Sequence, residues 1–240
     1  LGVKGMLYVE LILTTMSRDV HSQYAPVLPS AAWQMVELLG KLRKDGIVQI
    51  PGFYEDIIPA TEEENAILNA GPNVDEALKK TYGTYPVYDK KTGYYATLNN
   101  QPTFNISGVF SGFTGEGGAT VLPSKATAKI DMRLVVAQSG EKILGQLKDY
   151  IRTLGYDNVE VVCRGITDPA KTSIHTPYLP VIQKAVNGIF GSSLIYPNRP
   201  STAPDYLWTN ILGLPTIQVR WCDFDSDNHA PNEHLSVENY

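Results

Sequence analysis

Ala126-Thr-Ala-Lys-Ile-Asp-Met-Arg-Leu-Val-Val136 decides the fold of this chain, because apolar and polar side chains alternate along it. Ala, Ile, Met and Leu occupy the even positions from 126 to 134, and Thr, Lys, Asp and Arg occupy the odd positions between them. Successive side chains of a strand point to opposite faces of a sheet. The alternation therefore predicts a strand over 126–136 that buries one face and leaves the other face polar.

Further strands and helices are predicted on both sides of this strand. Apolar runs and helical spacing of apolar residues predict strands over 6–16, 103–110 and 158–163 and helices over 30–44 and 141–154. Ser30 could act as the N-cap of the first helix. Residues from about 47 to 100 hold four prolines and two short helical pieces that begin near Thr61 and Val74, and we interpret them as an insertion. Without it, the order strand, helix, strand, strand, helix, strand predicts a ferredoxin-like split βαβ domain.

After residue 165 the pattern changes. Helices are predicted over 180–190 and 204–212, and strands over 193–196 and 216–221. This last part alternates helix and strand, yet about 70 residues are too few for an α/β domain of their own. The predicted fold class is thus α/β, with an α+β domain over 1–165 and an incomplete α/β portion over 166–240.

Composition excludes several classes of function. The chain has 240 residues and a net charge of −5, so it offers no basic face for nucleic acid. No apolar run reaches the ~18 residues of a membrane span. Cys163 and Cys222 are far apart and are expected to be buried, reduced thiols. We therefore expect a cytoplasmic protein that binds neither nucleic acid nor membrane.

Several short patterns could carry chemistry, and each has a simpler alternative. Asp19 and His21 follow the first strand and point the same way; they are either a ligand or substrate-contacting pair, or a loop cap beside a surface histidine. The glycine-rich residues 112–118 either hold an anion or only connect two strands. Arg133, on a polar strand face, either grips a carboxylate or is solvated. Ser201 or Thr202 either caps a helix or donates to a substrate oxygen.

His229 lies in a loop rich in Asp, Asn and Pro that follows an apolar run. Loops at the ends of buried strands often carry binding and catalytic residues. A single imidazole cannot hold a catalytic zinc ion, which takes three protein ligands and keeps one position open. The residues alone therefore leave His229 undecided between a ligand and a polar loop residue.

Four segments, in this order, resemble those of a known family: Gly2-Val-Lys-Gly5 with Asp19-Val-His-Ser22, Gly117-Gly-Ala-Thr-Val-Leu-Pro123, Ile130-Asp-Met-Arg-Leu-Val135, and Asn228-His-Ala-Pro-Asn-Glu233. The family is that of the zinc-dependent aminoacylases, carboxypeptidases and dipeptidases, which includes acetylornithine deacetylase, succinyl-diaminopimelate desuccinylase and the carnosinase-type dipeptidases. The insertion, with Ile50-Pro-Gly-Phe53 and Thr61-Glu-Glu-Glu64, resembles the carnosinase-type branch.

The resemblance implies a role for each part of the chain. Residues 1–165 are expected to form the lid or dimerisation domain, and 166–240 the C-terminal portion of the zinc-peptidase catalytic domain. His229 matches a metal ligand, and His21 matches the lid histidine that reaches the partner subunit's active site and polarises the scissile carbonyl. Arg133 matches the arginine that grips the substrate carboxylate, and Thr120 and Thr202 are expected to line the same pocket.

The resemblance also implies a cofactor, a substrate class and a partner. The cofactor is a pair of Zn²⁺ ions, and imidazole and carboxylate ligands would also accept Mn²⁺ or Co²⁺. The substrate is a small peptide or an N-acyl amino acid with a free carboxylate. The partner is a second copy of the chain, bound through the lid to give a homodimer.

The chain departs from the family pattern at three points. Gln23 follows His21-Ser22 where the family usually has Gly, and Arg199-Pro-Ser-Thr202 stands where carnosinase-type relatives have Glu-Gly-Gly-Ser, so its specificity should differ. The family's His-x-Asp and Glu-Glu motifs lie N-terminal to the lid, and this chain does not contain them there. We therefore expect a fragment that is inactive by itself. The alternatives are a dimerisation or interaction module and an inactive homologue.

Overall fold

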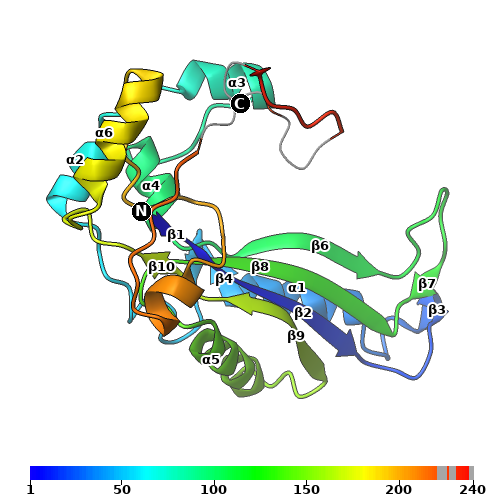
Figure 1. The fold of residues 1–240 in the computed structure, drawn as a ribbon. Coiled ribbons are helices and arrows are strands. Elements are labelled where there is room, and N and C mark those ends of the chain that lie inside the picture. Colours follow the sequence, from blue (N-terminus) through cyan, green and yellow to red (C-terminus); the bar gives the residue numbers. More distant parts are fainter. Residues whose placement is uncertain (221–225, 227–230, 238–240) are drawn as a thin grey trace.

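The computed structural model describes residues 1–220, 226 and 231–237. Its centre is an antiparallel sheet in the order β6-β8-β2-β9 (Figure 1). The strands span Asn105–Ser111 (β6), Lys125–Leu134 (β8), Gly5–Thr14 (β2) and Val159–Thr167 (β9). β8 lies between β6 and β2, so β2 and β6, the first two strands of this sheet along the chain, are not neighbours in it. This order confirms the predicted ferredoxin-like split βαβ domain.

Helices α1 (Ala31–Leu42) and α5 (Gly140–Thr153) cover one face of the sheet (Figure 1). Buried and partly exposed residues alternate along β2 and β8, as the sequence predicts. The buried side chains form the core with one apolar stripe from each helix: Leu7, Val9, Leu11 and Leu13; Ala126, Ala128, Ile130, Met132 and Leu134; Met35, Leu38 and Leu42; Ile143, Leu147 and Ile151. The Ser30 hydroxyl accepts the Trp33 N–H at 3.4 Å, which confirms the predicted N-cap.

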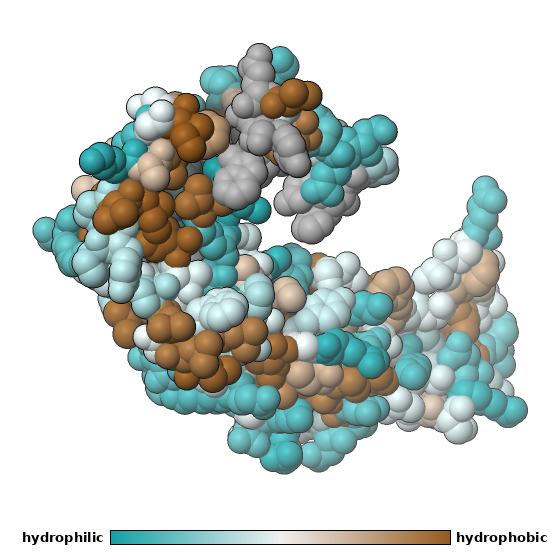
Figure 2. Space-filling model, viewed as in Figure 1, coloured by the Kyte–Doolittle hydropathy of each residue, from teal (hydrophilic) through white to brown (hydrophobic). Residues whose placement is uncertain are grey.

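The opposite face of the sheet is polar and open. Figure 2 shows the molecular surface hollowed between this face and helix α3 (Asp75–Tyr82). Arg164 on β9 forms an ion pair there with Glu10 on β2, at 2.5 Å. Cys163, which was expected to be buried, is exposed on β9, and Cys222 lies outside the described residues.

The predicted insertion contains more regular structure than its sequence indicates. A hairpin of β4 (Arg43–Lys44) and β5 (Ile47–Val48) leads into it, with Asp45 and Gly46 at φ 51° and 83° in the turn. Helices α2 (Glu62–Asn69) and α3 confirm the two predicted pieces. Helix α4 (Tyr94–Asn100) was not predicted, because Gly93 offers no side-chain cap at its start.

A two-stranded ribbon extends beyond one end of the sheet. It consists of β3 (Val20–His21) and β7 (Val121–Leu122), followed by the short 3-10 helix η1 (Ser22–Tyr24). The glycine-rich residues 112–118 connect β6 to β7.

The C-terminal part differs most from its prediction. β1 (Gly2–Val3) pairs with β10 (Ala170–Lys171), and α6 (Leu179–Phe190) confirms a predicted helix. The helix predicted over 204–212 is only the π-helix η2 (Leu207–Ile211). The strands predicted over 193–196 and 216–221 are wrong within the described residues, because a strand requires a hydrogen-bonded neighbour and no described strand lies beside them.

Two polar contacts tie the insertion to this C-terminal part. Lys171 forms an ion pair with the buried Glu64 at 2.6 Å, and Asn198 Nδ2 donates to the Asn99 carbonyl at 2.8 Å. The helical end in Figure 1 therefore combines segments from both predicted parts, and the division at residue 165 stays a prediction. Within the described residues, no helix is both long enough and apolar enough to cross a membrane.

Candidate functional site

His21 and Thr120 lie together on the ribbon. The Gln23 N–H donates to His21 Nδ1 at 3.1 Å, and His21 Nε2 lies 3.3 Å from Thr120 Oγ1. In the neutral imidazole, an accepting Nδ1 leaves the proton on Nε2. Both side chains are exposed, so the Nε2–H group can exchange the threonine hydroxyl for an oxygen of a bound molecule.

Asp19 holds the ribbon on the sheet rather than pairing with His21. Its Oδ1 accepts the Ser124 hydroxyl at 2.6 Å and the Ser124 N–H at 2.7 Å. These two bonds, the hydroxyl first, lower the pKa of the Asp19 carboxyl. Of the two alternatives for Asp19, the structure therefore supports the loop cap, and the cap fixes the base of the ribbon that carries His21.

Arg133 and Thr202 form a second pair, on the open face of the sheet. Arg133 Nη1 donates to Thr202 Oγ1 at 2.6 Å, and Thr202 Oγ1 donates to the Gly5 carbonyl at 3.3 Å. The Arg133 backbone is fixed by Thr103, whose N–H donates to the Arg133 carbonyl and whose hydroxyl accepts the Arg133 N–H, both at 3.0 Å. Thr202 is thus bound to Arg133 and does not cap a helix, since η2 has no side-chain cap.

Lys4 lies next to this pair and was not singled out from the sequence. It is 2% exposed, and its Nζ donates to the carbonyls of Leu98 at 2.8 Å and Gln101 at 2.5 Å. Burial, and to a lesser extent the charge of Arg133, together lower the pKa of the Lys4 ammonium group to about 8. The one sequence signal was a charged residue within the otherwise uncharged start Leu1-Gly-Val-Lys-Gly5.

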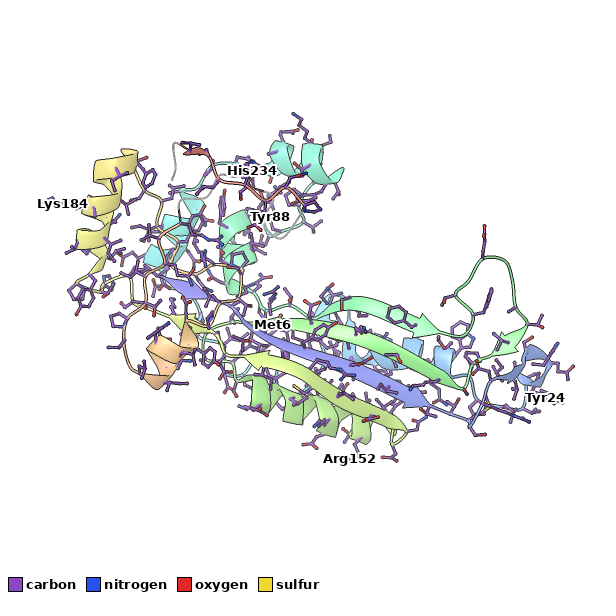
Figure 3. The ribbon with its side chains drawn as sticks, turned by 45° about the vertical axis from the view of Figure 1, so that its right-hand side comes forward. Met6, Tyr24, Tyr88, Arg152, Lys184 and His234 are labelled. Carbon is purple, nitrogen blue, oxygen red and sulfur yellow. The ribbon has the colours of Figure 1, made fainter. Side chains whose placement is uncertain are left out.

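The two pairs lie at opposite ends of the sheet. Met6 is the register partner of Arg133, and Tyr24 lies just past His21; Figure 3 labels both and shows them far apart. Along β8, Arg133 is eight residues from Lys125, where the ribbon meets the sheet. At ~3.4 Å per residue this is about 27 Å. An extended dipeptide spans only about 7 Å between its ends. One copy of the chain therefore does not bring His21 and Arg133 to the same small substrate.

The described residues do not fit a metal centre. Among them, no three His, Cys, Asp or Glu side chains are grouped closely enough to hold an ion. Both ring nitrogens of His21 already face other groups, the Gln23 N–H and the Thr120 hydroxyl. His229, the predicted metal ligand, lies outside the described residues.

Comparison with known proteins agrees with this architecture. Residues 1–159 match the family described as the peptidase dimerisation domain. An M20 family metallo-carboxypeptidase from Sulfolobus solfataricus superposes with a TM-score of 0.93 at 32% identity, over 100% of this chain and 56% of that one. The chain is 25% identical over 258 residues to a Cys-Gly metallodipeptidase of Saccharomyces cerevisiae, and 24% identical over 249 residues to a Beta-Ala-His dipeptidase of Homo sapiens.

These alignments cover 100% of this chain but 52% of the yeast protein and 49% of the human one. The chain thus spans about half the length of the curated relatives it matches. The split βαβ sheet with its ribbon is the fold of a dimerisation domain from a peptidase. The chain belongs to the peptidase dimerisation domain family, and the resemblance noted from its sequence motifs is confirmed.

Proposed function

We propose that this chain supplies the lid, and part of the catalytic domain, of a metal-dependent peptidase that cleaves dipeptides or N-acyl amino acids. We further propose that each active site combines Arg133 and Thr202 of one copy with His21 and Thr120 of a second copy. The observation that carries this proposal is that the two pairs lie at opposite ends of the sheet within one chain, since Arg133 is already about 27 Å from Lys125, where the ribbon begins. The relatives are named metallodipeptidases and dipeptidases, which supports the reaction class.

The chemistry of each pair supports its role. Arg133 presents a planar guanidinium that can bind a carboxylate through two hydrogen bonds, and Thr202 holds one of its nitrogens in place. Lys4 adds a second positive charge nearby, which favours an anion at this end of the sheet. The His21 Nε2–H group can donate to the scissile carbonyl oxygen as negative charge develops on it, a type of contact worth ~10²–10³ in rate.

The cofactor is proposed on the same grounds. The relatives' names specify a metal, and the sequence resemblance specifies zinc, with Mn²⁺ or Co²⁺ as alternatives. His229 remains the proposed ligand from this chain, and the other ligands would come from outside it.

A second copy of the chain has a suitable surface to bind. On α1, Trp33 and Val36 are 70% and 55% exposed. The outer edge of β6 has no partner strand among the described residues, and it carries the exposed Val109 and Phe110. α1 packs against β8, which is the neighbour of β6. The exposed residues of α1 and the outer edge of β6 therefore lie near one another. Unpaired apolar edges favour pairing with another strand.

A groove of about 680 Å³ continues this surface toward the ribbon. Its lining includes Leu28 and Trp33 from the α1 side and Val121, Leu122 and Pro123 from the β7 side. A partner seated on α1 and β6 would therefore contact the base of the ribbon that carries His21. This arrangement supports the proposal that dimerisation and site assembly are one event.

The proposed incomplete catalytic domain also has a surface to be covered. Side chains of α6 and of η2 expose apolar groups, and Figure 2 shows brown patches over both elements. These exposed residues include Val181, Ile189, Leu207 and Ile211. Soluble proteins rarely leave large apolar patches exposed. We propose that the remainder of the catalytic domain packs on this face.

Complementation between inactive variants of the full-length protein tests the shared site. His21→Ala and Arg133→Ala dimers should each lose activity, the first mainly in kcat and the second mainly in KM. After unfolding and refolding together, random pairing gives half mixed dimers, in which one of two sites holds both native residues. The mixture should therefore recover about a quarter of wild-type dipeptidase activity.

Two controls make the outcome decisive. The double variant carrying both substitutions on one chain, mixed with wild type, leaves mixed dimers in which each site lacks one residue, so it should add no activity beyond that of the wild-type dimers. If the mixture of the two single variants recovers no activity although both variants dimerise, the site is not shared between two copies. Wild-type protein that hydrolyses no dipeptide or N-acyl amino acid would contradict the reaction class itself.

A further inference from the structure

Lys4 is a buried cation, and no ion pair with it is found among the described residues. Buried lysines are rare, and they usually have an acidic partner. The two acceptors of Lys4 are instead carbonyls at the C-terminal end of α4, Leu98 and Gln101. This end of a helix carries unpaired carbonyls and partial negative charge, so it stabilises an ammonium group. Lys4 therefore ties the start of β2 to the end of the insertion.

Two short paths lead from Lys4 to Arg133. The first runs through Gln101 to Thr103, whose backbone and hydroxyl fix the Arg133 backbone at 3.0 Å. The second runs through the main chain, because Lys4 N–H donates to the Ser201 carbonyl at 3.0 Å.

The second path continues through Gly5 and Thr202, the residues that follow Lys4 and Ser201 in the chain. The Gly5 carbonyl accepts the Thr202 hydroxyl, which in turn accepts Arg133 Nη1. The junction is tight, since a Cβ atom at Gly5 would lie 2.5 Å from the Thr167 carbonyl oxygen. Both the backbone and the guanidinium of Arg133 are thus held by segments that Lys4 fastens.

We propose that Lys4 is a positioning residue, which holds Arg133 and Thr202 in the geometry that binds the carboxylate of the substrate. This inference rests on the proposed function for its substrate, but its structural part does not. Lys4 acts through Arg133 and does not touch the substrate, since it is 2% exposed and its ammonium group donates to the carbonyls of Leu98 and Gln101. Its charge adds to the positive potential at the guanidinium and so strengthens the attraction for an anion.

A double-mutant cycle in the full-length protein separates this role from a purely structural one. Lys4→Met should raise KM for a dipeptide with a free carboxylate by roughly tenfold, with little change in kcat. In an Arg133→Met background the same substitution should change KM by less than about twofold, because its target is gone. Lys148→Met, at an exposed position on α5, which covers the face of the sheet opposite Arg133, is the matched control and should leave KM unchanged.

An equal increase of KM in both backgrounds would overturn the inference, because a helix cap without coupling to Arg133 gives additive effects. If Lys4→Met does not fold, Lys4→Gln replaces it, since the amide removes the charge but can still donate to one carbonyl. If the wild-type full-length protein showed no hydrolytic activity, that result would contradict the proposed function but not the positioning role of Lys4. The crystal structure of the Lys4→Gln chain then decides: a displaced Arg133 side chain supports positioning, and an intact bond to Thr202 overturns it.

Discussion

At the scale of single residues, Lys4 occupies a position that globular proteins usually give to an apolar side chain. Its ammonium group exchanges hydration for two carbonyl acceptors, and burial, with the charge of Arg133, lowers its pKa from 10.5 to about 8. The charged form is therefore less stable in the folded protein than in the unfolded chain. Burial of the Lys4 charge lowers the stability of the folded protein. A buried lysine beside Arg133 therefore points to a role in the site rather than in stability.

The shifted pKa predicts how stability depends on pH. Between about pH 8 and 10.5 the unfolded chain retains the Lys4 proton and the folded chain does not. The unfolded state then binds more protons, so the contribution of Lys4 to the free energy of unfolding rises with pH, by on the order of 3 kcal/mol in total.

Urea unfolding of wild type and Lys4→Met across this pH range measures the effect. The difference between the two proteins removes the titration of tyrosines and other lysines. We expect wild type to gain stability relative to Lys4→Met from pH 8 upward. A difference that stays flat across the range would mean that Lys4 titrates normally.

At the scale of elements, α2 shows how the insertion is fixed. Thr61 Oγ1 accepts the Glu64 N–H at 3.1 Å, and Glu64 Oε2 accepts the Thr61 N–H at 3.0 Å, which completes a capping box. The other carboxylate oxygen of Glu64 binds Lys171 at 2.6 Å. The cap of α2 and its attachment to β10 thus depend on one side chain.

Removing the capping hydroxyl should destabilise this helix. Thr61→Ala should lower the free energy of unfolding by about 1 kcal/mol, because the Glu64 N–H loses its acceptor. Thr61→Ser keeps the hydroxyl and serves as the control, with an expected change of a few tenths of a kcal/mol. Thermal or urea unfolding measures both variants, and equal losses in the two would show that the hydroxyl is not what matters.

The elements also show what local sequence can and cannot predict. β2, β8, α1 and α5 were predicted because alternating or helical periods record burial on one face. The segment 216–221 has the composition of a buried strand, but pairing depends on a neighbour that local sequence does not reveal. The Asp45-Gly46 turn is a missed signal, since Asp-Gly favours positive φ at both positions of a two-residue hairpin.

At the scale of the whole molecule, the sequence predicts the individual site residues but not how they pair. His21, Thr120, Arg133 and Thr202 were selected from motifs, and the structure joins them as two pairs. Which residue pairs with which was not predictable, because Arg133 and Thr202 are 69 positions apart and meet only through tertiary packing. Lys4 was missed for the same reason, as its acceptors lie more than ninety positions away.

The association of two copies is the last consequence of this arrangement. If α1 and the β6 edge form the interface, a charge placed there would be buried without a partner and would prevent association. Trp33→Glu and Phe110→Glu should each convert dimers to monomers in sedimentation velocity, without changing the far-UV circular dichroism, because both side chains are more than half exposed. Val87→Glu, at a residue 98% exposed on the insertion, should leave the dimer intact. Because His21 would then lack a partner's Arg133, the monomeric variants of the full-length protein should lose dipeptidase activity together with their dimers. Full activity in a proven monomer would contradict assembly of the site from two chains, whatever surface the dimer uses.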